Sequence, residues 1–187
     1  MSNVIPTFGR SEFARILDAP LPTVNSYITR DLIPTLVGKR KRPALTGFDA
    51  WLAVSADMFC REGGLDRTVV SRAMSMQLNS LLEYARRIDV GEQNLAAIIV
   101  TRADGKSGCL CRPLAENVLK GLVGPIIRTA FISLNVAADL VRTNAQEQGV
   151  DIGDRIGLTA DEWTNLNPLK RGRSDAKNER QASQRHD

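Results

Sequence analysis

The chain has 187 residues, of which 43% are hydrophobic and 25% charged, with a formal net charge of +4. This is the composition of a folded globular protein with one ordinary core or two small ones. No run of about 18 apolar residues and no signal-peptide pattern occur, and the three cysteines are an odd number for disulfides, so we expect no membrane insertion, no secretion and a cytoplasmic location.

The first predicted elements are two short helices joined by a tight turn. Ser11 is a candidate cap for a helix over residues 11–18. Pro20 and Pro22 prevent that helix from continuing, and Pro22 suits the first position of a second helix that ends near Leu32. The second helix carries a polar side, which suits a helix that lies in the major groove of DNA. The candidate base-reading or phosphate-binding residues there are Thr23, Asn25, Ser26, Tyr27 and Arg30.

A basic loop follows the second helix. Lys39, Arg40, Lys41 and Arg42 are consecutive, between Gly38 and Pro43. Such a run is by itself most often a solvated surface, but its position after two helices and a turn favours the tip of a DNA-binding wing, with short strands at 36–37 and 44–45. We expect these four cations to contact phosphates or to enter the minor groove.

Two further helices are predicted before residue 90. Thr46 is a candidate cap for a helix over 47–61, which Gly63 and Gly64 end. A longer helix is expected over 66–88, with an apolar stripe long enough to pack against a second domain or another protomer.

Several of these residues resemble the MerR-type regulators, bacterial winged-helix DNA-binding proteins that dimerise through a long helix. The resemblance covers about residues 7–88. Its motifs are Phe13-Ala14, Val24 and Tyr27, Asp31-Leu32-Ile33-Pro34, the basic loop and Gly63-Gly64-Leu65. It implies a winged helix-turn-helix fold and a homodimer.

The pattern changes after Gly91. Residues 95–101 and 126–134 are predicted strands, and 113–123 and 135–148 are predicted helices, which together indicate a small α/β domain. Alternatively, residues 113–148 are largely helical. Thr159 and Glu162 form a candidate capping box for a last helix over 161–166. The basic tail from residue 168 lacks apolar periodicity, and we expect it to be disordered.

We therefore predict a mainly α protein with a small α/β part. It comprises a winged helix-turn-helix (1–64), a long linking and dimerisation helix (65–90), an α/β domain (91–167) and a disordered basic tail (168–187). The α/β domain is expected to dimerise or to bind an effector or a partner.

Catalytic chemistry is not indicated. The single histidine, His186, lies in the tail, so a nucleophile would have no histidine base, and no phosphate-binding glycine motif is present. Cys109 and Cys111 have the spacing of two metal ligands, but no further ligands lie nearby, and we interpret them as structural. We expect no enzyme activity, metal or cofactor.

The favoured function is sequence-specific binding of double-stranded DNA by a homodimeric bacterial or phage-like transcriptional regulator associated with the nucleoid. RNA polymerase or an integrase are the expected further partners. The alternatives are a DNA-architectural, excisionase-like recombination factor, a DNA-packaging small subunit, and a protein-interaction module that does not bind DNA.

Overall fold

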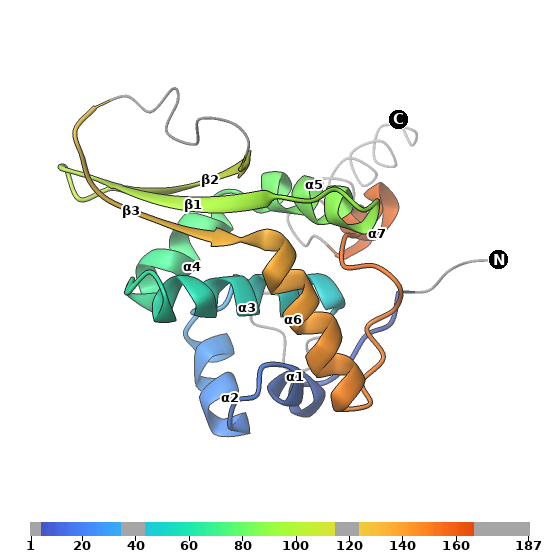
Figure 1. The fold of residues 1–187 in the computed structure, drawn as a ribbon. Coiled ribbons are helices and arrows are strands. Elements are labelled where there is room, and N and C mark those ends of the chain that lie inside the picture. The colour runs from blue at the N-terminus through green and yellow to red at the C-terminus, as the bar shows by residue number, and fades with distance from the viewer. Residues whose placement is uncertain (1–4, 35–43, 115–123, 167–187) are drawn as a thin grey trace, which may run out of the picture.

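The computed structural model describes residues 5–34, 44–114 and 124–166. Within these ranges the protein is mainly helical with one small antiparallel sheet (Figure 1). In chain order the elements are α1 (Arg10–Ile16), α2 (Leu21–Thr29), α3 (Gly47–Arg61), α4 (Arg67–Ser75), α5 (Leu78–Asp89), β1 (Leu95–Arg102), β2 (Ser107–Pro113), β3 (Ile126–Ser133), α6 (Leu134–Glu147) and α7 (Ala160–Leu166).

Helix α1 begins one residue earlier than predicted, with Gly9 rather than Ser11 at its cap. The Glu12 carboxylate accepts a hydrogen bond from the Gly9 N–H at 2.8 Å, which closes the first turn. At the other end Asp18 has a φ of 46°, and the Ala19 N–H donates to the Ala14 carbonyl at 3.0 Å. This left-handed residue reverses the chain and fixes the tight turn.

Helix α2 ends before Leu32 in the same manner. Asp31 has a φ of 54°, and the Leu32 N–H donates to the Tyr27 carbonyl at 2.8 Å. The predicted extension to Leu32 is therefore wrong, because a left-handed residue satisfies the last carbonyls and turns the chain away. An aspartate in the left-handed conformation thus follows the C-terminal end of each of the two helices.

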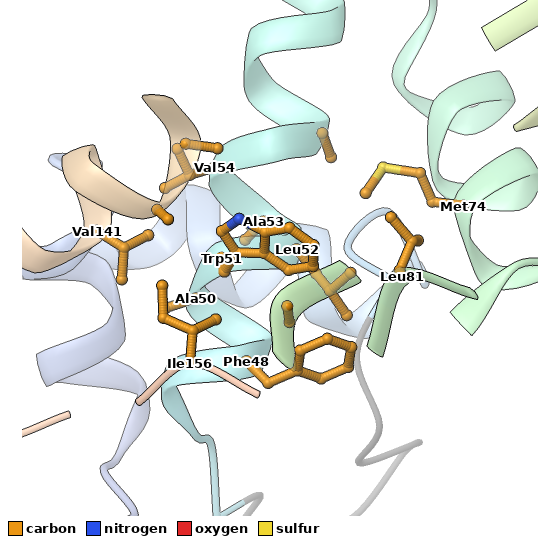
Figure 2. Close-up of a cluster of buried hydrophobic side chains, with 14 of the residues drawn as sticks. Phe48, Ala50, Trp51, Leu52, Ala53, Val54, Met74, Leu81, Val141 and Ile156 are labelled. Carbon is orange, nitrogen blue, oxygen red and sulfur yellow. The ribbon is translucent and has the colours of Figure 1, made fainter. Parts of the chain in front are cut away.

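Helix α3 confirms its prediction at both ends. The Thr46 N–H donates to the Asp49 carboxylate at 2.9 Å, and the Asp49 N–H donates to Thr46 Oγ1 at 3.4 Å, which is the reciprocal capping arrangement. Gly64, with a φ of 60°, follows its C-terminus. Almost every residue of α3 is buried, so this helix forms the centre of the core (Figure 2).

The long helix expected over residues 66–88 is instead two helices, α4 and α5. Gln77 breaks it with φ −120° and ψ 21°. Residues on both sides of the break belong to one core, since Met74 before it and Leu81 after it are fully buried within the chain. The stripe assigned to a dimerisation helix is thus used inside the protein.

The sheet has the strand order β2-β1-β3, and both pairs are antiparallel. Strands β1 and β3 and helix α6 confirm the predictions, whereas no strand is predicted for residues 107–113, which form β2. The domain is therefore not built from alternating strands and helices, and the alternative of a largely helical segment over 113–148 is wrong. The predicted helix over 113–123 has its first residue, Pro113, in β2, and residues 115–123 lie outside the described ranges.

One face of the sheet packs on the helices. Leu95, Ala97 and Ile99 of β1 join the same hydrophobic cluster as residues from Phe8 to Trp163. Trp51 of α3 donates from its indole N–H to the Leu134 carbonyl of α6 at 3.1 Å. Residues from all three predicted folded units contribute to this core. No helix in the described part of the chain has the length and apolar character needed to cross a membrane.

Candidate nucleic-acid interface

Helices α1 and α2 lie at the end of the molecule opposite the sheet (Figure 1). Val24 of α2 and Phe13 and Ile16 of α1 are buried, and they anchor the two helices to the core. With one side of α2 fixed in this way, the remaining residues of α2 face either a neighbouring helix or solvent. The five predicted contact residues are consequently divided among four environments.

Asn25 faces α1. Its side-chain oxygen accepts a hydrogen bond from Arg10 Nη1 at 3.1 Å, and Asn25 is half-buried. The Nε of Arg10 is buried and has no hydrogen-bond partner among the described residues, which is an uncommon state for a charged donor. In this arrangement Asn25 links the two helices, and Arg10 is a cation beside α2 that the sequence analysis missed.

Tyr27 faces α4. The guanidinium carbon of Arg67 lies 4.2 Å from the centroid of the Tyr27 ring, and Arg67 also pairs with Asp57 of α3. Four residues further along in each segment, the Ser71 hydroxyl of α4 donates to the carbonyl of Asp31, which follows the end of α2, at 2.7 Å. Helix α4 therefore holds both the ring of Tyr27 and the backbone just after α2.

Ser26 and Arg30 lie one turn apart on the side of α2 that faces away from these contacts. Arg30 and Thr29 are exposed, and Ser26 is half-buried. No carboxylate occurs between Leu21 and Arg30. This face carries hydroxyl groups and one cation. Such groups can donate hydrogen bonds to the phosphates of a polyanion.

The four wing cations, Lys39, Arg40, Lys41 and Arg42, lie outside the described residues, as do positions 36–37 of the first expected wing strand. Leu45, from the second expected strand, is buried and pairs with Phe8 in an antiparallel bridge, with N–H to carbonyl distances of 2.9 and 3.1 Å. This bridge attaches the chain after the basic loop to the segment that precedes α1.

Thr23 lines a hollow of about 390 Å³ beside α2. The hollow is lined by the α1–α2 turn, α2, α3, the first residue of α4, and α6. Its lining residues are as far apart in the sequence as Leu17 and Asn144. No local sequence pattern indicates such a hollow, because its sides come from segments that meet only in the folded chain.

Cys109 and Cys111 lie on the face of β2 that packs toward the helices. Cys109 is buried, and a hydrogen bond with Cys111 together with burial raises the pKa of its thiol well above the ordinary value. In the described ranges no group of three or more histidine, cysteine or acidic side chains is placed to hold a metal ion. Both cysteines, and Cys60, have free thiols.

Alkylation tests this environment. In the folded protein iodoacetamide should modify Cys109 much more slowly than the same cysteine in urea, because only the thiolate reacts and the raised pKa keeps Cys109 protonated. The alkylation rate of Cys109 in the folded protein should rise only at a pH above the range in which an ordinary thiol ionises. Peptide mass spectrometry after timed labelling between about pH 7 and pH 10 measures this. Equal native and unfolded rates would contradict the buried position of Cys109.

Comparison with known proteins adds no assignment: no protein-family model and no curated protein matches the chain.

Proposed function

We propose that the protein binds double-stranded DNA in a sequence-specific manner, with α2 in the major groove and residues 39–42 on the flanking backbone. The observation that carries this proposal is a face of α2 and its C-terminal end without carboxylates, formed by the half-buried Ser26 and the exposed Thr29 and Arg30. Four consecutive cations begin nine residues after Arg30. Side chains of these types make base-edge and phosphate contacts. The most suitable class is a winged-helix transcriptional regulator of the type found in bacteria and phages, acting as a homodimer.

The surroundings of α2 support a division of roles among the predicted residues. Ser26 and Arg30 are the candidate DNA contacts. Asn25 and Tyr27 are positioning residues, since Arg10 and Arg67 engage them from neighbouring helices. Rigid placement of a recognition helix limits the conformational entropy lost on binding.

A comparison of Arg30→Ala with Asn25→Ala tests this division. We expect Arg30→Ala to weaken binding about tenfold and to reduce the salt dependence of log K by about one unit, because one phosphate or base contact is lost. We expect Asn25→Ala to weaken binding to all sequences to a similar extent without changing the salt dependence. Fluorescence anisotropy at several salt concentrations measures both.

A change in sequence preference in Asn25→Ala would support the base-reading role that the sequence predicts for Asn25. If this variant instead relaxes the preference for adenine at one position of the selected site, Asn25 reads a base directly. Retained salt dependence in Arg30→Ala would remove Arg30 from the interface.

Selection of bound fragments from random DNA, followed by sedimentation with and without the selected site, tests the function itself. We expect an enriched sequence and a complex with two chains per site. Absence of any DNA affinity at low salt would exclude the proposal and favour a protein-interaction module. Strong bending of the selected site without an effect on a promoter would favour an architectural role.

A further inference from the structure

The hollow beside α2 has an apolar floor and a charged end. Ala53, Val54 and Met58 of α3 form the floor and are almost fully buried, and Leu140 of α6 borders it. A volume of about 390 Å³ lies within the range of small-molecule sites in proteins. A ligand that covers this floor must have an apolar body, because a fully polar ligand would lose its hydration there without compensation.

The charged end consists of Asp57 and two arginines. Arg61 Nε lies 2.5 Å from Asp57 Oδ2, and Arg67 pairs with the other carboxylate oxygen. One carboxylate is thus shared by two guanidinium groups, and this cluster carries a net positive charge. The carboxylates of Asp18 and Glu62 also border the hollow, and water screens the charges of these two residues and of Arg61, since all three are exposed. Selectivity for a carboxylate therefore rests on directional hydrogen bonds from Arg61 rather than on the net charge of the hollow.

The two Nη groups of Arg61 remain as hydrogen-bond donors for a ligand. Its side chain is 74% exposed, and its Nε is the atom that contacts Asp57. A guanidinium has five N–H donors, and its two Nη groups form a planar fork that matches a carboxylate. The Arg67 side chain, only 15% exposed, holds Asp57 in place from the other side.

We propose that this hollow binds a small amphipathic carboxylic acid. The apolar body of the acid lies on Val54 and Met58 against Leu140, and its carboxylate accepts hydrogen bonds from Arg61. Because Thr23 and Tyr27 of α2 form one wall, the bound acid contacts the helix whose position Arg67 also fixes. This binding does not depend on the proposed DNA function and is measured without DNA.

The test uses the full chain with isotope-labelled methionine methyl groups. Met58 lines the hollow, whereas Met76 is 66% exposed and does not border it, so it serves as an internal control. The probes are octanoate, octanol and octylamine, which share one alkyl chain and differ in charge. We expect octanoate to shift the Met58 signal in a saturable manner and more strongly than the other two probes, with no change at Met76.

Two variants test whether octanoate binding depends on the guanidinium group of Arg61. Arg61→Gln should weaken octanoate binding about tenfold, corresponding to the loss of one charge-assisted contact, and should leave octanol binding unchanged. Lys106→Gln, which removes an exposed charge from the β1–β2 turn, should alter neither. Three results would each overturn the proposal: no saturable shift at Met58, octylamine binding as tightly as octanoate, or normal octanoate binding by Arg61→Gln.

Discussion

Replacing Lys39, Arg40, Lys41 and Arg42 together by alanine should reduce DNA affinity on the order of a thousandfold at physiological salt. Each phosphate-bound cation releases about one condensed counterion, so loss of all four should lower the salt dependence of log K by roughly three to four units. The preference for the selected sequence over a scrambled one should change much less, because the proposed base-reading groups belong to α2 and its C-terminal end. Anisotropy titrations of both duplexes at several salt concentrations provide these values.

A matched control separates this local effect from a general loss of charge. Alanine at Lys170, Arg171, Arg173 and Lys177 in the basic tail removes the same number of cations from another part of the sequence. We expect this variant to weaken binding far less. Equal losses from the two variants would mean that net charge alone governs the affinity, and the four residues would have no specific role.

Truncation of Trp51 to alanine should lower the free energy of unfolding by about 3 to 5 kcal/mol. Trp51 is fully buried at the centre of the core, its ring centroid lies 5.8 Å from that of Phe48, and its indole N–H bonds to the Leu134 carbonyl (Figure 2). The variant loses this packing and leaves a buried carbonyl without its donor. Urea unfolding followed by circular dichroism measures the loss.

The same experiment tests whether the N-terminal and C-terminal parts unfold together. Trp51 joins α3 to α6, so the destabilised protein should still unfold in a single transition, with the fluorescence of Trp163 changing at the same urea concentration. Trp51→Phe, which keeps an aromatic ring, should cost less than Trp51→Ala. Two separate transitions, with one half of the chain retained, would contradict a shared core.

Local sequence signals determined the elements whose ends depend on their own side chains. Thr46 and Asp49 define the start of α3, and Thr159 and Glu162 define the start of the last helix through hydrogen bonds of 2.6 and 3.3 Å. Strands β1 and β3 were also predictable, since a short run of β-branched residues bounded by turn residues favours an extended chain. These signals act over a few residues and need no partner.

Tertiary structure alone decided the break at Gln77, the pairing of β2 and the environment of α2. An unbroken apolar stripe over 66–88 is compatible with one long helix, and no glycine or proline in that stretch marks the division into α4 and α5 at Gln77. The polar face of α2 looks continuous in the sequence. In the folded protein Asn25 contacts Arg10, Tyr27 contacts Arg67 and Thr23 lines the hollow. These partners come from other helices, from the neighbouring α1 to the distant α4 and α6, so the sequence of α2 does not show them.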